Sequence, residues 1–165
     1  MNSKILGIIV AVIVIAAGVL IYYEFFDNGG TVNVKVADAP VGASAVYITF
    51  KDVYVHSNST GWQNFSVTAK TIDILDLTTT NASLFGSISL KAGTYTMIKL
   101  AIVNVTVVMG GQHVNFTSAN GYVDIVTPFT VSAHSTTNII IEFNLTQDLN
   151  LMAKTFTPTA SMSMT

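Results

Sequence analysis

After Gly30 the chain alternates between apolar and polar residues with a period of two, which is typical of strands that have one buried face. The segment 31–38 alternates around three valines, and the segment 45–56 repeats the pattern with larger apolar residues. Turn-forming residues such as glycine, proline and asparagine separate these runs. The pattern predicts a β-sandwich with strands at roughly 31–38, 45–56, 62–68, 71–76, 94–108, 113–117, 122–131 and 138–145.

Two other segments are less regular. The run from Phe156 to Met164 alternates equally well, and Pro158, which has no amide hydrogen to donate, favours the edge of a sheet. The segment from Asn81 to Ser89 spaces its large apolar residues three and four apart, so it predicts the one short helix of the domain.

The parity of the apolar positions changes twice within long runs. Apolar residues shift to the other parity after Lys51-Asp52, which predicts a bulge or bend that re-aims the strand. A second change near Val103 predicts a corner there. Each change moves the following side chains to the opposite face of the sheet.

The amino-terminal segment is of a different kind. Ile5 to Tyr23 is a run of 19 residues without a charge, and twelve of them are Ile, Leu or Val. At about 1.5 Å per residue, such a helix spans roughly 28 Å, close to the apolar thickness of a bilayer. The sequence therefore predicts a transmembrane helix within residues 1–26, a short joint at 27–30 that includes Asn28-Gly29-Gly30, and an extracytoplasmic domain at 31–165.

The charges beside this segment predict its orientation. Lys4 precedes the run, whereas Glu24 and Asp27 follow it, so we expect a single-pass cell-membrane protein with a cytoplasmic amino terminus and an extracellular domain. Two alternatives involve cleavage. A removed signal peptide would use the small residues Ala16-Ala17-Gly18, and a pilin-like cut would follow Gly7.

Composition narrows the classes of partner. Charged residues are 10% of the chain, there is no arginine, and the net charge is −2. A nucleic-acid-binding surface needs a basic stripe, so we expect no nucleic acid partner. The chain has no cysteine, which excludes disulfides, thiol chemistry and a lipid-modified cysteine.

Possible attachment points for sugars are frequent. Six of the 12 asparagines begin an Asn-x-Ser/Thr triplet, a modest excess over chance for a chain with this Ser and Thr content. Strand parity places the acceptors in runs opposite to an apolar row, so they should face water. The predicted N-glycosylation sites are Asn58, Asn64, Asn81, Asn104, Asn115 and Asn144.

Three aromatic residues are candidate ligand contacts. Trp62, the one tryptophan in the chain, lies between the triplets at Asn58 and Asn64 and has the outward parity of Asn64. An outward indole could stack on a glycan or on a bound carbohydrate, whereas the ordinary alternative is that it covers the edge of the core. Tyr47 and Tyr54 are further candidates on the neighbouring strand, although alternating aromatics often only pack.

Several pieces of the sequence resemble a family of secreted or surface-anchored prokaryotic β-domains of unknown function. The resemblance covers most of residues 32–145, and its combination with a membrane helix and glycosylation triplets is similar to archaeal envelope members. It implies an extracytoplasmic immunoglobulin-like or transthyretin-like sandwich without catalytic residues to carry over. The matching pieces are "VADAP", "AVYITFKDVYVHS" followed by "GW", "IDILDL", "LKAGTYTMIKLAI" and "PFTVSAHSTTNIIIEFNL".

Motifs for catalysis or metal binding are weak. His56, His113 and His134 lie far apart, and none has a second histidine or a cysteine at ligand spacing. Asp73 and Asp76 lack the Asp-x-Asp-x-Asp-Gly pattern of a calcium loop, and their odd spacing places the two side chains on opposite faces of a strand. We therefore expect no catalytic residue, no metal and no cofactor.

These observations favour a non-catalytic, membrane-anchored and N-glycosylated cell-surface domain with a structural or adhesive role in the envelope. Its expected partners are the membrane through Ile5 to Tyr23, N-linked glycans, and envelope proteins or further copies of itself. A first alternative is a pilus or filament subunit that assembles by strand addition or through its amino-terminal helix. A second alternative is a sugar- or protein-binding module that uses the three aromatic candidates.

Overall fold

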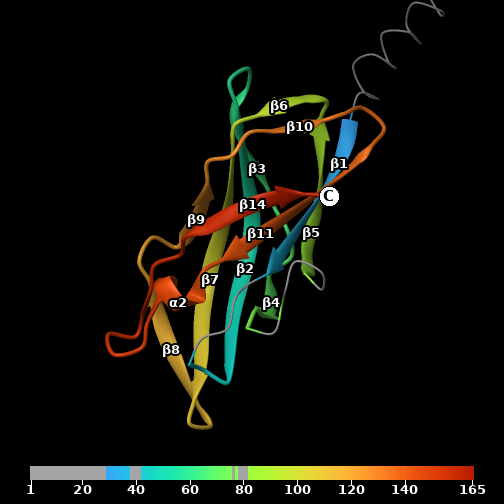
Figure 1. The fold of residues 1–165 in the computed structure, drawn as a ribbon. Coiled ribbons are helices and arrows are strands. Elements are labelled where there is room, and N and C mark those ends of the chain that lie inside the picture. The colour runs from blue at the N-terminus through green and yellow to red at the C-terminus, as the bar shows by residue number, and fades with distance from the viewer. Residues whose placement is uncertain (1–28, 38–41, 76, 78–81) are drawn as a thin grey trace, which may run out of the picture.

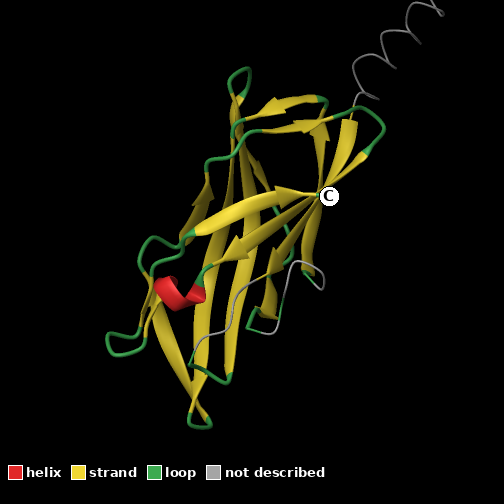
Figure 2. Cartoon of the chain, viewed as in Figure 1, coloured by secondary structure: helices red, strands yellow, loops and turns green. Residues whose placement is uncertain are grey.

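The computed structural model describes residues 29–37, 42–75, 77 and 82–165. Strands dominate this part of the chain, and its helical content is a single turn (Figures 1 and 2). The expected all-β class is thereby confirmed. The elements are β1 (Gly29–Ala37), β2 (Ala45–Ser57), β3 (Gly61–Phe65), β4 (Lys70–Asp73), β5 (Ser83–Lys91), β6 (Gly93–Tyr95), β7 (Met97–Met109), β8 (Gln112–Ser118), β9 (Tyr122–Ile125), β10 (Phe129–Val131), β11 (Thr136–Phe143), α2 (Leu145–Asp148), β12 (Leu149–Asn150), β13 (Thr155–Phe156) and β14 (Ala160–Met164).

The strands form two main sheets, which Figure 1 shows as two layers. The smaller sheet has four strands in the order β14-β11-β1-β5, and β1 runs parallel to β11 but antiparallel to β5. The larger sheet has eight strands, with the path β12-β13-β8-β7-β2-β3, and β4 and β9 pair with β2 and β7. β6 and β10 form a separate pair.

The inner faces of the two sheets share one hydrophobic core. The ring of Phe50 on β2 lies 5.6 Å from that of Phe85 on β5 and 5.7 Å from that of Phe143 on β11, measured between centroids. The valines of β1, together with Ile139 and Ile141 of β11, are fully buried in the same cluster. This packing of two alternating faces is the predicted β-sandwich.

Both predicted changes of parity are β-bulges in the long strands β2 and β7. The pairing of the two strands shifts between Lys51 and Val53, where Asp52 adopts a left-handed φ of 44°. A second shift leaves Val103 unpaired between Ile102 and Asn104, and Val103 is exposed. The bulges allow each strand to keep an apolar face on the core along its whole length.

The predicted helix within 81–89 is wrong, because residues 83–91 form strand β5. The pairing of β5 with β1 shifts between Leu84 and Gly86, so Phe85 is an extra residue in the strand. This bulge separates the buried side chains of Phe85 and Ile88 by three positions. A bulged strand therefore reproduced the spacing of a helix.

Three runs that were each predicted as one strand form two strands in different sheets. The run 94–108 breaks into β6 and β7, and the run 122–131 breaks into β9 and β10. The final alternating run supplies β13, which pairs with β8, and β14, which pairs with β11 of its own chain. β14 is an edge strand, as Pro158 just before it predicted.

The start of the described chain is fixed in the smaller sheet. Gly29 and Gly30, which we expected in a joint, are the first two residues of β1 and pair with β5. The predicted membrane helix at Ile5 to Tyr23 and the rest of the joint lie outside the described residues. Among the residues that are described, no helix has the length and apolar character needed to cross a bilayer.

Candidate functional site

The outer face of the larger sheet carries a group of exposed and partly exposed aromatic side chains around one lysine. We call this group, Tyr54, His56, Trp62, Lys99 and Tyr122, the aromatic patch. Its members come from four adjacent strands, since β2 lies between β3 and β7, and β9 pairs with β7. Trp62 and Tyr122 retain 48% and 39% of their accessible surface, whereas large apolar side chains are more often buried.

Lys99 is the centre of the patch. Its Nζ lies 5.0 Å from the centroid of the Trp62 ring and 5.2 Å from that of Tyr122, within the range of cation–π attraction. The same Nζ lies 3.1 Å from Oδ1 of Asp124, its cross-strand neighbour on β9. The lysine charge is thus compensated, and the patch offers a donor and an acceptor side by side among aromatic rings.

Further ring contacts order the rest of the patch. The His56 and Trp62 rings meet edge to face at 5.2 Å, and those of Tyr54 and Tyr122 at 5.8 Å. His56 Nδ1 also lies 2.7 Å from the Thr96 hydroxyl, which fixes the imidazole. Edge-to-face pairs such as these hold side chains in defined orientations.

The bulge at Asp52 explains why these residues share a face. The extra residue changes the parity of β2, so Tyr54 and His56 point outward while Val53 and Val55 are buried. Aspartate adopts the left-handed conformation more readily than most residues, which suits this position. Beyond the bulge, the outward face of β2 therefore presents the rings of Tyr54 and His56 next to β3.

The Tyr54 hydroxyl stays protonated over a wide pH range. Partial burial raises the pKa of this phenol above its usual 10.0, and Tyr122 and Asp52 contribute further to the rise. A neutral phenol can both donate and accept hydrogen bonds. Tyr54 thus adds a polar edge to the aromatic surface.

The structure brings together two of the three predicted ligand contacts. Trp62 and Tyr54 belong to the patch, whereas Tyr47 lies beyond the bulge and stacks on His113 at 6.1 Å. Sequence reasoning missed Lys99 and Tyr122. The outward parity of Lys99 was readable, but the pairing of β9 with β7, which brings Tyr122 beside it, was not.

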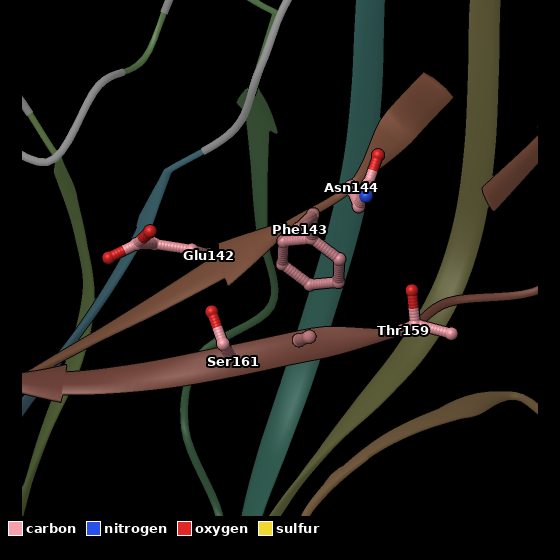
Figure 3. A pocket seen from close by; sticks show the side chains of 6 residues that line it. Glu142, Phe143, Asn144, Thr159 and Ser161 are labelled. Carbon is pink, nitrogen blue, oxygen red and sulfur yellow. The ribbon is translucent and has the colours of Figure 1, made fainter. Parts of the chain in front are cut away.

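A hollow in the surface lies where β11 ends and β14 begins (Figure 3). It has a volume of about 460 Å³, and its lining comes from those two segments alone. Just beside it, the buried Asp148 carboxylate accepts hydrogen bonds from the amide and hydroxyl of Thr159. Burial raises the pKa of Asp148, and these hydrogen bonds oppose the rise. The lining residues are Glu142, Phe143, Asn144, Thr159, Ala160 and Ser161.

Comparison with protein families identifies the family of the chain. Residues 29–157 match the family described as "Domain of unknown function (DUF4382)". The chain belongs to the DUF4382 family. This match covers all the strands except β14, so the patch and the core lie within the family region.

Comparisons with individual proteins add little to the family assignment of this DUF4382 domain. Among solved structures, one match is the crystal structure of a candidate cell adhesion protein from Bacteroides eggerthii, with 13% identity and a TM-score of 0.39. The alignment covers 82% of this chain and 55% of that one, so the chain spans about half of that protein. A TM-score of this size does not establish a shared fold. No curated protein matched.

The predicted glycan acceptors of the DUF4382 domain lie on its surface wherever the structure describes them. Asn81 is outside the described residues, and the other five side chains are exposed. Asn104 on β7 donates to the Thr106 hydroxyl at 3.1 Å, and that hydroxyl donates to Asn115 on β8 at 3.0 Å. The exposed acceptors are Asn58, Asn64, Asn104, Asn115 and Asn144.

Within the described residues, the DUF4382 domain has no group of three His, Cys, Asp or Glu side chains that could hold a metal ion. His56 contacts Trp62 in the patch, and His113 stacks on Tyr47 on the other side of the bulge. Asp73, singled out in the sequence, accepts hydrogen bonds from the amides of Val46 and Leu75. Its carboxylate therefore fixes the backbone where β4 ends, at Asp73 itself.

Proposed function

We propose that this chain is a non-catalytic adhesive domain of the cell surface, and that the aromatic patch is the face with which it holds its partners. The observation that carries the proposal is the grouping of Trp62 and Tyr122, both substantially exposed, around Lys99. Single exposed apolar residues are ordinary, but a contiguous group marks an interaction site. Aromatic residues are also the side chains that contribute most to binding energy at interfaces.

The form of the patch suits a partner surface. Its residues project from adjacent strands of one sheet, and the His56–Trp62 and Tyr54–Tyr122 contacts hold the rings in place before a partner arrives. Pre-ordered side chains lose little conformational entropy on binding, which favours affinity. The Lys99–Asp124 pair adds polar groups that can select a partner by hydrogen bonding.

We further propose that the domain lies outside the cell, anchored by the apolar run from Ile5 to Tyr23 and modified at its Asn-x-Ser/Thr triplets. The length of the run and the flanking charges support the anchor. Exposure of all five described acceptors supports glycosylation, because an attached sugar must face water. A surface with few charges also gains solubility from sugars.

Adhesion is tested with cells that carry the full chain. Cells with Trp62→Ala/Tyr122→Ala should attach to one another or to a defined surface about tenfold less than wild-type cells, because both anchor rings are lost. Leu84→Ala is the matched control, since Leu84 is exposed on the other sheet. Equal attachment by the patch variant and the wild type would remove the proposal.

Location and modification need separate measurements. Resistance of the chain to alkaline extraction from membranes, together with cleavage of the domain by protease added to intact cells, is the expected result for an outward-facing anchor. The intact mass of the purified chain should exceed the polypeptide mass of 17.6 kDa by the mass of its sugars. A mass equal to that of the bare polypeptide would exclude glycosylation.

A further inference from the structure

One of the predicted glycan acceptors directly adjoins the aromatic patch. Asn64 on β3 is paired with Tyr54 on β2 in the antiparallel register. It follows Trp62 by two residues, and the burial pattern of β3 places both side chains on the same outer face. Asn64 is therefore next to one ring of the patch along its strand and opposite another ring across the strands.

The spacing of a sheet brings these three side chains within reach of one sugar. Residues two apart on a strand are separated by roughly 6.6–6.8 Å, and directly opposite Cβ atoms by about 4.5–5.5 Å. A sugar bonded to the amide nitrogen of Asn64 begins at the end of an exposed side chain between Trp62 and Tyr54. Its first rings can lie over the patch without any movement of the backbone.

The chemistry of the patch fits a sugar ring. A pyranose has faces of polarised C–H bonds, and the faces of aromatic rings are electron-rich, so the two attract each other. Hydroxyl groups at the sugar rim need donors and acceptors, and the Lys99–Asp124 pair and the neutral Tyr54 hydroxyl supply both. Because Asp124 compensates the charge of Lys99, the patch does not require an anionic ligand.

The acceptor at Asn104 has a different setting. Its cross-strand partner on β2 is Thr49, and its amide bonds to the Thr106 hydroxyl. A sugar there begins among threonine and asparagine side chains. The contrast makes Asn104 a control on the same face of the same sheet.

We propose that the glycan attached to Asn64 folds over the aromatic patch, occupies it through its first pyranose rings, and so regulates access of partners to the patch. This inference rests on the N-glycosylation and the adhesive face proposed above. A patch covered by this glycan is closed to other partners, and the fraction of chains without it provides the adhesion of wild-type cells. The fraction of chains that carry a glycan on Asn64 thus determines how strongly the cells attach.

The chain holds one tryptophan, and it is in the patch, so tryptophan fluorescence reports on the patch alone. The full chain purified from the membranes of its native host is compared with Ser66→Ala, which destroys the triplet of Asn64 but keeps Asn64 itself. Quenching by acrylamide should be about twofold stronger in S66A, because the sugar that shields the indole is gone. Ser66→Thr retains the triplet and should match the wild type.

Two further results are expected. Asn104→Gln should leave the quenching unchanged, since its glycan lies beyond the bulge from Trp62. Cells with S66A should attach more strongly than wild-type cells. Mass analysis of the peptide around Asn64 should show a glycan in the wild type and in S66T, and none in S66A.

The inference is overturned if the Asn64 peptide carries no glycan, or if it carries one and S66A quenches like the wild type. These results are distinct from failure of the proposed adhesive function. If S66A raises quenching but Trp62→Ala/Tyr122→Ala cells attach normally, the glycan covers the patch and adhesion uses another face. If S66A quenches like the wild type but Trp62→Ala/Tyr122→Ala cells attach less, the patch is adhesive and the Asn64 glycan does not regulate it.

Discussion

Oδ1 of Asp148 accepts hydrogen bonds from both the amide and the hydroxyl of Thr159, at 2.9 and 2.6 Å. Oδ2 of the same carboxylate accepts a longer bond of 3.3 Å from the amide of Asn144. The carboxylate is almost completely buried and ties the turn after β11 to the segment that leads into β14. One side chain therefore links the residue after β11 to the residue before β14, beyond the end of the pairing between these two strands.

Asp148→Ala should destabilise the fold by about 2–3 kcal/mol, because buried donors on Thr159 and Asn144 lose their acceptor. Asp148→Asn should cost roughly half as much, since an amide oxygen can still accept both bonds from Thr159. Denaturant unfolding followed by circular dichroism measures both values. An equal cost for the two variants would show that packing, and not the hydrogen bonds to Thr159, is what matters.

The same carboxylate predicts an unusual response to acid. Burial raises the pKa of Asp148 in the folded chain above its ordinary value of 3.8, so the folded state binds a proton more readily than the unfolded state. Its contribution to stability is fully present below 3.8 and is lost as the pH rises through the folded pKa. The melting temperature of the wild type should thus rise relative to Asp148→Asn as the pH falls from 7 towards 4. A relative decrease would contradict the raised pKa.

The contact between the two sheets centres on Phe50. Because its ring is fully buried between Phe85 and Phe143, Phe50→Ala should lower the free energy of unfolding by about 3–5 kcal/mol. Val103→Ala, at the exposed bulge residue, should change it by less than about 0.5 kcal/mol. Urea titration of the three proteins provides the comparison. A small effect at Phe50 would mean that the two sheets do not meet there.

Gly30 lies where the loop before β11 approaches β1. A Cβ at this position would lie 2.6 Å from the carbonyl oxygen of Ser132 and 2.6 Å from Cγ1 of Val131. Gly30→Ala should therefore destabilise the domain by about 1–3 kcal/mol. Gly42→Ala is the control, because a Cβ there has no neighbour within 4 Å. If both substitutions have the same effect on the melting temperature, the loop does not pack against Gly30.

The sequence predicted those features that depend on local alternation. The long strands β2 and β7 bury their apolar parity, so the bulges at Asp52 and Val103 were visible in the sequence as changes of parity. The bulge at Phe85 was misread because the same insertion in a short segment leaves apolar residues three apart, as a helix does. A local pattern cannot separate these two origins.

Pairing between distant strands could not be read from the pattern. Alternation predicted β1 and β11 as strands, but not that they run parallel side by side, over 100 positions apart in the chain. For the same reason the outward parity of Trp62 was predictable, while its contact with Lys99 was not. The candidate site became visible only when the sheet order placed four strands together.

The attraction between Trp62 and Lys99 can be measured by a double-mutant cycle. Both side chains are at the surface, so Trp62→Ala and Lys99→Ala should each cost about 1 kcal/mol or less. Their coupling energy should be about 0.5–1 kcal/mol, because the ammonium lies over the indole. Trp62 and Lys51 form the control cycle, because Lys51 lies beyond the bulge and the two changes should add. A loss of about 3 kcal/mol or more from Trp62→Ala alone would mean that the indole covers the core, and the exposed patch would then not exist as described.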